Sequence, residues 1–575
     1  MNKSALKRFA TETRVELISV VSTKLDYLLG LGNDLPVELK DHKENIGKMT
    51  ALCSANGMVD EEKKEAFVEE VAYTWFNRLM ALRFMDANGI TESKAVSPLE
   101  GQTLPEIFNE AKGGNIPDGL RLDRDTFFGL IDGKIPSANP DNEAYRMLFV
   151  SVCNHYADIM PFMFEAISDH TELLMPDDML SSNSIRAKVV EAMSDEDCEN
   201  IEIIGWLYQF YIAQKKDEVF AALKKNKKIT PANIPAATQL FTPGWIVKYM
   251  VENSLGKLWM LNHPDSKLHE NMKYYIVNEE ETIDFLKIGS PEDLTILDPC
   301  MGSGHILTYA FDLLTKIYEE EGYNKSDIPS LILENNIYGC DIDKRAATLA
   351  QFALMMKAQM YYRRFFKKDV NPQVLELHTE SLNDEQVEEY LNSIGTDLLT
   401  VDISTLVESF RDVKNIGSLV KPMGVDIDAV EARFNTLKPE QNLFYNDIYQ
   451  TIKALIPQAK MLGSTYACVV TNPPYMGSKG MNKELSDFVK KVYPDSKSDL
   501  FAVFMERTLE LTKDHGFMAM INQHSWMFLS SYEKLRIKLL ENHKIDTLVH
   551  LGPRAFEEIS GEVVQSVAFV LQKGK

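Results

Sequence analysis

The spacing of apolar residues divides the chain into two blocks. Residues 1–225 carry apolar positions at three- and four-residue spacing, for example from Glu65 to Met85, without the alternation that is typical of strands. This pattern predicts an all-helical N-terminal domain. A segment rich in proline and charged residues follows at 225–235, and this composition predicts a linker. We therefore predict a second domain over residues 226–575.

The second block alternates between short apolar runs and helical stretches, which predicts an α/β fold with a Rossmann-like, doubly wound sheet and helices on both faces. Seven strands are expected, near residues 294, 336, 374, 466, 516, 545 and 564. An acidic, mostly helical insertion is predicted at about 383–464, and the sequence suggests no chemical role for it.

A strand, a glycine loop and a helix follow one another near residue 300. The apolar run 294–298 ends in Asp298, the loop contains Gly302, Ser303 and Gly304, and an apolar helix is expected from about residue 305. Glycines let the backbone approach a nucleoside closely, and a helix N-terminus offers free N–H groups. A leucine occupies the place of the third glycine of a dinucleotide fingerprint, which disfavours a nicotinamide cofactor.

Two further strand ends carry polar groups suited to nucleoside chemistry. Asp341 closes the second strand, where a carboxylate can hold ribose hydroxyls. The buried-looking strand 466–470 runs into Thr471-Asn-Pro-Pro-Tyr475. The Asn472 oxygen and the Pro473 carbonyl can each accept an N–H from an exocyclic amine, and Tyr475 offers a ring on which a base can stack. The alternative is a simple strand-ending turn.

Taken together, the motifs resemble those of the S-adenosylmethionine-dependent N6-adenine DNA methyltransferases of the gamma order, in the same order along the chain. A further match is the segment 239–243, which in this family lies over the methionine end of the cofactor. The resemblance implies an antiparallel last strand and two sets of site residues. The catalytic set is Asn472, Pro473, Pro474 and Tyr475; the S-adenosyl-L-methionine set is Phe241, Thr242, Pro243, Asp298, Gly302, Ser303, Gly304, Asp341, Ile342, Glu380, Ser381, Leu382 and Phe501.

Closer similarity concerns the segments 1–14, 204–211 and 475–482, which resemble the PglX-type adenine-specific DNA methyltransferases of BREX phage-defence systems. This resemblance implies methylation of double-stranded DNA at a flipped adenine, in phage defence and host DNA marking, with other defence-system proteins as partners. Members of that family run well past this length, so we expect a catalytic fragment or a short form.

Composition sets outer bounds on this interpretation. The 575 residues, 45% of them hydrophobic, lack an apolar span or signal segment, so we expect a cytoplasmic protein without membrane contact. The six cysteines show no spacing suited to zinc, and we expect no metal and no disulfide. A net charge of −24 argues against extensive nonspecific DNA binding. Basic residues cluster at 357–368 and after the Asn-Pro-Pro-Tyr motif, where lysines border the expected path of a flipped base.

Other functions stay open at this level. Protein-glutamine and RNA methyltransferases share the Asn-Pro-Pro-Tyr motif, because each acts on a planar conjugated amine. A noncatalytic subunit of a defence complex that only senses the cofactor is a third hypothesis. A fused nuclease is disfavoured, because the first block lacks a recognisable nuclease motif.

Overall fold

The computed structural model describes most of the chain and divides it into two compact units, Met1–Gln214 and Lys215–Lys575. The described residues are 2–32, 35–55, 58–165, 170–277, 284–380, 382–395, 398–437, 443–553, 555–556 and 565–574. The predicted domain boundary at residue 225 stays a prediction. No helix in these ranges is long and apolar enough to cross a membrane.

The first unit is built from helices, as the apolar spacing predicts, with one small addition. A hairpin of two-residue strands, β1 (Ser54–Ala55) and β2 (Met58–Val59), lies between two of the helices. The helices are α1 (Lys3–Gly30), α2 (Lys43–Leu52), α3 (Glu61–Ala87), α4 (Glu106–Lys112), α5 (Arg124–Ile131), α6 (Pro140–Ala157), α7 (Pro161–Phe164), α8 (His170–Leu173), α9 (Ile185–Ala192) and α10 (Glu202–Lys224), the last of which continues into the second unit.

Aromatic side chains form much of the core of the first unit. Phe76 on α3 lies with ring centroids 6.0 Å from Phe9 of α1 and 4.7 Å from Tyr211 of α10. Elsewhere on α3, the buried carboxylate of Asp86 accepts backbone N–H bonds of 2.8–2.9 Å from residues 95–97. Burial of these rings contributes to the stability of the unit.

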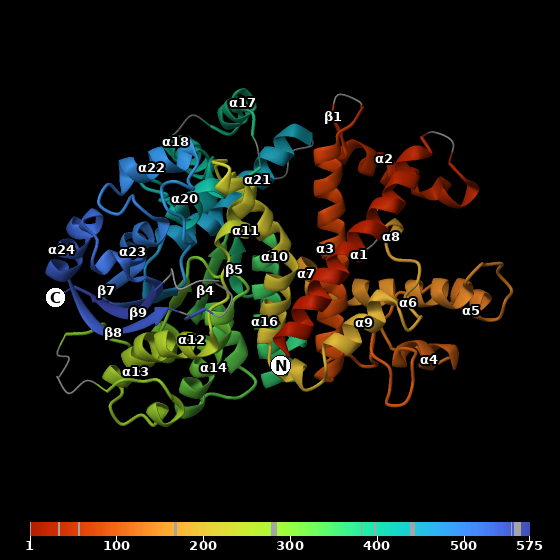
Figure 1. The fold of residues 1–575 in the computed structure, drawn as a ribbon, viewed down its shortest axis with the longest axis horizontal. Coiled ribbons are helices and arrows are strands. Elements are labelled where there is room, and N and C mark those ends of the chain that lie inside the picture. The colour runs from red at the N-terminus through yellow and green to blue at the C-terminus, as the bar shows by residue number, and fades with distance from the viewer. Residues whose placement is uncertain are drawn as a thin grey trace. The chain divides into compact units, whose positions relative to one another are not determined.

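The second unit contains a seven-stranded sheet, which confirms the predicted α/β fold (Figure 1). Its order is β5-β4-β3-β6-β7-β9-β8, and only β9 runs antiparallel to its two neighbours. The strands are β3 (Ile296–Asp298), β4 (Ile337–Asp341), β5 (Gln373–Glu376), β6 (Tyr466–Thr471), β7 (Thr512–Gln523), β8 (His543–Pro553) and β9 (Gln565–Lys573).

Helices alternate with these strands, and a helical group separates β5 from β6 (Figure 1). The connecting helices are α11 (Ile234–Thr238), α12 (Gly244–Val251), α13 (Lys257–Asn262), α14 (His305–Glu320), α15 (Ile328–Leu331), α16 (Lys344–Tyr361), α22 (Lys483–Val492), α23 (Leu500–Leu511) and α24 (Glu533–Asn542). The group between β5 and β6 consists of α17 (Asp384–Ile394), α18 (Leu398–Phe410), α19 (Val413–Ile416), α20 (Ile427–Thr436) and α21 (Leu443–Gly463).

The strand order has a consequence for where a ligand can bind. From β3 the chain proceeds outward through β4 and β5, then returns to the other side of β3 with β6. In doubly wound sheets, the loops that leave two such strands diverge, and the crevice at the C-terminal ends of these strands is where ligands bind. All six residues of β6 are buried, as a central parallel strand requires.

Candidate active site

The loops that leave β3 and β6 are joined at the base of this crevice. The Thr471 hydroxyl donates a 2.7 Å hydrogen bond to the Asp298 carboxylate, which also accepts the N–H of Cys300. Asp298 is 1% exposed, and this burial raises its pKa to about 7. Asp298 therefore fixes the glycine loop against the start of the Asn-Pro-Pro-Tyr loop.

The glycine loop requires glycine at two positions for different reasons. Gly304 precedes α14 with φ +80°, and an added Cβ would lie 2.9 Å from the Cβ of Ala350 on α16. Gly302 has φ +52°, but an added Cβ there would meet nothing within 4 Å. Gly304 thus allows close packing, whereas Gly302 leaves open space above the loop. Ser303 lies half-buried between them.

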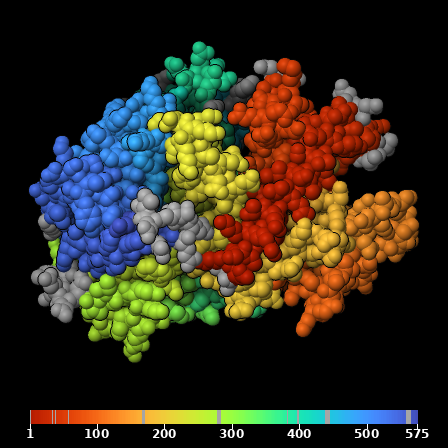
Figure 2. Space-filling model, viewed as in Figure 1, coloured from red at the N-terminus to blue at the C-terminus, as the bar shows by residue number. Residues whose placement is uncertain are grey.

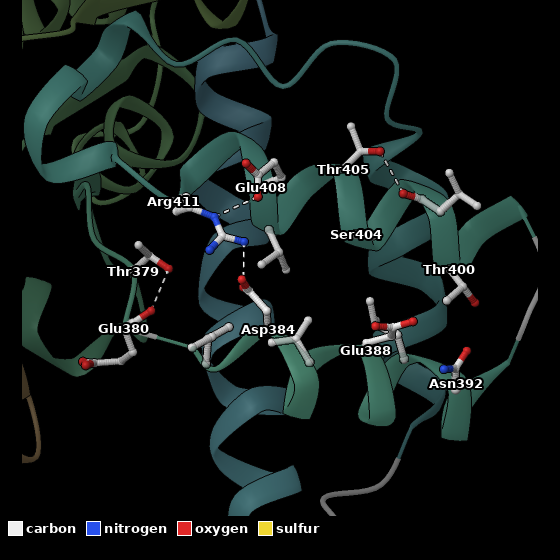
Figure 3. Close-up of a pocket in the computed structure, with 15 residues that line it drawn as sticks. Thr379, Glu380, Asp384, Glu388, Asn392, Thr400, Ser404, Thr405, Glu408 and Arg411 are labelled. Carbon is white, nitrogen blue, oxygen red and sulfur yellow. Dashed lines mark hydrogen bonds and ion pairs between the residues drawn. The ribbon is translucent and has the colours of Figure 1, made fainter. Parts of the chain in front are cut away.

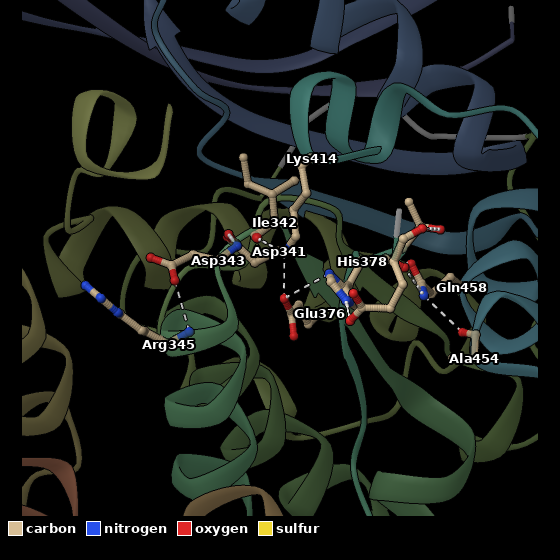
Figure 4. Close-up of polar contacts among 11 residues, drawn as sticks. Asp341, Ile342, Asp343, Arg345, Glu376, His378, Lys414, Ala454 and Gln458 are labelled. Carbon is tan, nitrogen blue, oxygen red and sulfur yellow. Dashed lines mark hydrogen bonds and ion pairs between the residues drawn. The ribbon is translucent and has the colours of Figure 1, made fainter. Parts of the chain in front are cut away.

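Asp341, at the end of β4, is tied to both neighbouring turns. Its carboxylate accepts the N–H of Gly302 at 2.9 Å and that of Asp343 at 2.9 Å. Burial raises the pKa of Asp341 to about 6, against the opposing effect of these hydrogen bonds. These two donors leave further lone pairs of the carboxylate free, and ligand hydroxyl groups can donate hydrogen bonds to them. Figure 4 shows Asp341 and Ile342 beside Lys414, which donates to the Ile342 carbonyl at 2.7 Å.

Asn472 has an amide whose orientation follows from its neighbours. Its nitrogen donates to the Leu240 carbonyl at 3.4 Å and to the Thr242 hydroxyl at 3.1 Å. Because a carbonyl can only accept, the nitrogen must face Leu240, and the oxygen must face the other way. That oxygen is buried and has no hydrogen-bond partner among the described residues. A buried amide oxygen without a donor is costly, so it is a candidate acceptor for a ligand N–H.

The segment Phe241–Pro243 connects the two loops. The Phe241 ring stacks on His305, the first residue of α14, with centroids 4.6 Å apart. The Thr242 hydroxyl holds the Asn472 amide. Thr242 does not cap the following helix, because α12 begins at Gly244 and Pro243 occupies its N-cap. The threonine hydroxyl is therefore used by the candidate site and not by the helix.

The rest of the Asn-Pro-Pro-Tyr loop is rigid and well supported. Pro473 is buried and Pro474 half-buried. The Tyr475 hydroxyl donates to the Ile521 carbonyl on β7 at 3.1 Å, and its ring meets Phe501 edge-on at 6.2 Å. Phe501 is fully buried in the core beneath Tyr475. The hydroxyl bond and the aromatic packing together fix the plane of the Tyr475 ring.

Two supporting features were not identified from the sequence. Asp499 accepts the N–H of Met476 at 3.0 Å and also caps α23, so it holds the C-terminal side of the catalytic loop. The Ser418 hydroxyl donates to the Pro299 carbonyl of the glycine loop at 2.7 Å. Ser418 belongs to the helical insertion, to which the sequence assigned no role. Both contacts join segments that are separated in sequence, so the local sequence around each residue does not predict them.

The segment after β5 differs from these loops. The side chain of Glu380 is 71% exposed and accepts a hydrogen bond from His378 at 2.7 Å. Glu380 and Leu382 line a cavity of about 610 Å³ between α17 and α18 (Figure 3), whose lining residues span 379–411 and include neither the glycine loop nor Asn472. Ser381 lies outside the described residues. The structure therefore groups most of the predicted residues at the β3–β6 crevice, with Glu380 and Leu382 on a separate cavity.

Comparison with known proteins agrees with the motifs. Residues 335–556 match the model of the Eco57I restriction-modification methylase family. The whole chain aligns, at 39% identity, with adenine-specific methyltransferase BrxX of Escherichia coli O9:H4 (strain HS), and covers 50% of that protein. It also aligns in full, at 37% identity, with adenine-specific methyltransferase PglX of Lacticaseibacillus casei (strain Zhang), covering 51% of it. The chain thus spans about half the length of the curated relatives it matches.

Among solved structures, the Type IIL restriction-modification enzyme MmeI in complex with DNA aligns over 100% of this chain and 57% of its own, with 15% identity and a TM-score of 0.43. At this TM-score and identity, the alignment adds no information to the fold that the strand order already defines. The alignments over the whole of this chain and the family match confirm the resemblance predicted from the motifs: this chain is similar to the BrxX and PglX adenine-specific methyltransferases, and its residues 335–556 match the Eco57I restriction-modification methylase family.

Proposed function

We propose that this chain transfers a methyl group from S-adenosyl-L-methionine to N6 of adenine in double-stranded DNA, in the cytoplasm, as part of phage defence and host DNA marking. The observation that carries the proposal is the buried oxygen of Asn472, which has no donor among the described residues, while the amide nitrogen donates to Leu240 and Thr242. The names of the two full-length relatives support adenine as the target.

The glycine loop and its neighbours fit the cofactor. Open space above Gly302 leaves room for a nucleoside to approach the backbone, and the Asp341 carboxylate retains lone pairs for ribose hydroxyls. The segment Phe241–Pro243 lies between the glycine loop and Asn472, where the methionine part would be held. Bound there, S-adenosylmethionine supplies an electrophilic methyl group on its sulfonium.

Asn472 and Pro473 prepare the target amine. The amine of adenine is a weak nucleophile because its lone pair is delocalised into the ring. Two acceptors, the Asn472 oxygen and the Pro473 carbonyl, each take one N–H bond and localise that lone pair on nitrogen. Catalysis then consists mainly of positioning and electrostatics, and the surplus proton leaves to water.

Tyr475 presents a ring on which the base can stack. Its plane is fixed by the bond to Ile521 and by Phe501, so little ordering is needed when a base arrives. To reach this ring, an adenine must leave the duplex, at a cost of a few kcal/mol that stacking and the amine contacts offset.

The proposal is tested by offering the purified chain three substrates with S-adenosylmethionine: duplex DNA, an RNA of matching sequence, and a glutamine-containing peptide. We expect methyl transfer to DNA alone. Cofactor binding by calorimetry, with Asp341→Ala as the control that loses it, reports independently on the pocket. Transfer to RNA or peptide in place of DNA contradicts the substrate assignment, and cofactor binding without any transfer supports a noncatalytic sensing subunit instead.

A further inference from the structure

A basic segment lies against the catalytic loop. Residues 219–251 contain no acidic residue, although 85 of the 575 residues of the chain are acidic. Four exposed lysines lie close together within this segment, at 224, 225, 227 and 228. This local excess of positive charge stands out against the net charge of −24. It marks a place where a polyanion can be bound by an otherwise acidic protein.

The backbone directs this segment toward the catalytic loop. α10 ends at Lys224, and Asn226 adopts a left-handed conformation with φ 61°. The N–H of Lys227 then donates back to the Ala222 carbonyl at 3.1 Å, which completes the helix cap and turns the chain away from the helix axis.

Two hydrogen bonds attach the turned segment to the catalytic loop. The Ile229 N–H donates to the Gly480 carbonyl at 3.2 Å, and the Lys228 ammonium donates to the Lys479 carbonyl at 2.5 Å. Ile229 also packs into the same core as Met476 and Met481. In Figure 2 the yellow surface around this segment lies beside blue surface of the catalytic-loop region.

Further lysines of the catalytic loop join the same surface. Lys479 and Lys483 are exposed, and the loop that carries Lys479 is held by a 3.0 Å bond from the Ser478 N–H to the Ser498 carbonyl. We define the lysine surface as Lys224, Lys225, Lys227, Lys228, Lys479 and Lys483. None of the six forms an ion pair with a carboxylate of the described residues. Their positive charges are therefore available to a ligand.

We propose that the lysine surface binds the phosphate backbone of the DNA substrate next to the base that the catalytic loop accepts. This inference rests on the proposed function and names the contact surface for its substrate. Lys479 lies four positions after Tyr475 in the sequence, so its backbone lies within about 14 Å of the Tyr475 backbone. A DNA duplex carries about eight phosphates over that length of helix axis. The surface can therefore bind phosphates immediately flanking the flipped base.

The test is the salt dependence of DNA binding, measured by fluorescence anisotropy with a labelled duplex. One variant replaces Lys224, Lys225, Lys227 and Lys228 with glutamine. The matched control replaces Lys325, Arg363, Arg364 and Lys367, which are also exposed and form no ion pair with a carboxylate of the described residues. These four follow α16 or precede β4, at the N-terminal edge of the sheet, opposite the crevice. Both variants remove the same positive charge.

The slope of log affinity against log salt is negative, and we expect its magnitude to decrease by about 0.9 for each phosphate that is no longer bound. The decrease should reach up to about 3.6 in the lysine variant, and the control should keep the wild-type slope. A second variant, Lys479→Gln with Lys483→Gln, should lower the slope by up to about 1.8. Retained cofactor binding verifies folding in all three.

Equal slopes in the lysine variant and the wild type, equal reductions in variant and control, or no DNA binding by the wild type would each overturn the inference. Methyl transfer is a separate readout. If the wild type binds DNA through these lysines but transfers no methyl group, the proposed function fails and the inference stands. If DNA is methylated and the slopes do not change, the inference fails and the proposed function stands.

Discussion

The segments that follow β6 and β5 were both expected to contribute to the site, and they differ in how they are held. After β6, Asn472 is oriented by two acceptors on a distant segment, and Tyr475 by a hydrogen bond and an aromatic neighbour. After β5, Glu380 is 71% exposed and contacts His378, two residues away in sequence.

This difference in how the side chains are held indicates which of the two segments takes part in chemistry. A polar group that a remote segment holds in place, with one atom left without a partner, has a geometry that local structure does not require. An exposed carboxylate with a local hydrogen bond has the geometry of any solvated side chain, and exposed pairs of this kind contribute at most about 1 kcal/mol. The loop after β6 is therefore the stronger candidate for chemistry.

The largest effect is expected for Asn472→Ala. Removal of one acceptor from the target amine should lower the rate of methyl transfer by about 10²–10³-fold, as for other preorganised polar groups in active sites. Rapid-quench measurement of transfer to DNA checks this. The matched control is Asn383→Ala, which removes the N-cap of α17, costs about 1 kcal/mol of stability and should leave the rate unchanged. An Asn472→Ala variant at the wild-type rate would contradict the catalytic assignment.

Tyr475→Ala should weaken DNA capture by about 10–100-fold, because a base stacked on an aromatic ring is worth about 1–3 kcal/mol. The KM for DNA reports this change, while calorimetry should show unchanged cofactor affinity. Tyr475→Phe keeps the ring and removes only the bond to Ile521, so its KM should stay close to that of the wild type. A parallel drop in cofactor affinity in Tyr475→Ala would show that the ring contacts the cofactor instead.

Cofactor affinity should depend on pH through Asp341. Its folded pKa of about 6 lies above the ordinary value because of burial, so the ionised form prevails only above that pH. Affinity should be full above it and fall by about tenfold per pH unit below it, as the acceptor is protonated. The stability of the free protein changes in the opposite direction. It rises as the pH falls through this range, because a group whose pKa is raised in the folded state binds its proton more tightly there than in the unfolded chain. Calorimetry across this range checks the first effect, and Asp341→Asn should abolish the pH dependence.

The two loop glycines should respond differently to substitution. Gly304→Ala places a Cβ 2.9 Å from Ala350 at positive φ and should cost about 1–3 kcal/mol of stability. Gly302→Ala meets open space and should cost about 1 kcal/mol, from its positive φ alone. Gly302→Val fills the space above the loop and should abolish cofactor binding. Thermal unfolding and calorimetry measure both quantities, and equal stability decreases at the two positions would show that packing against Ala350 is not what requires Gly304.

The smallest effect is expected for Glu380→Ala. This carboxylate is exposed and hydrogen-bonded to His378, and exposed pairs of this kind contribute little free energy. Cofactor affinity should therefore change by less than about twofold. Calorimetry is the measurement. A decrease of about tenfold or more would show that the segment after β5 also contributes to the site, and would assign to Glu380 the adenine-binding role that the family resemblance implies.

Much of the framework was predictable from the sequence. The apolar runs that end in Asp298, Asp341 and Thr471 located three parallel strands, because buried strands and glycine loops leave local signals. Contacts between remote segments leave none. The bond from Asn472 to Thr242 joins residues 230 positions apart, and the Ser418–Pro299 bond joins the insertion to the glycine loop. Those contacts depend on the strand order, which a motif does not encode.

We propose that Asn472 and its loop direct a methyl group onto the adenine amine. The most direct measurement is mass spectrometry of nucleosides from DNA incubated with the chain and methyl-labelled S-adenosylmethionine. We expect labelled N6-methyldeoxyadenosine with the wild type and almost none with Asn472→Ala. Label on another nucleoside, or equal N6-methyldeoxyadenosine from both proteins, would contradict it.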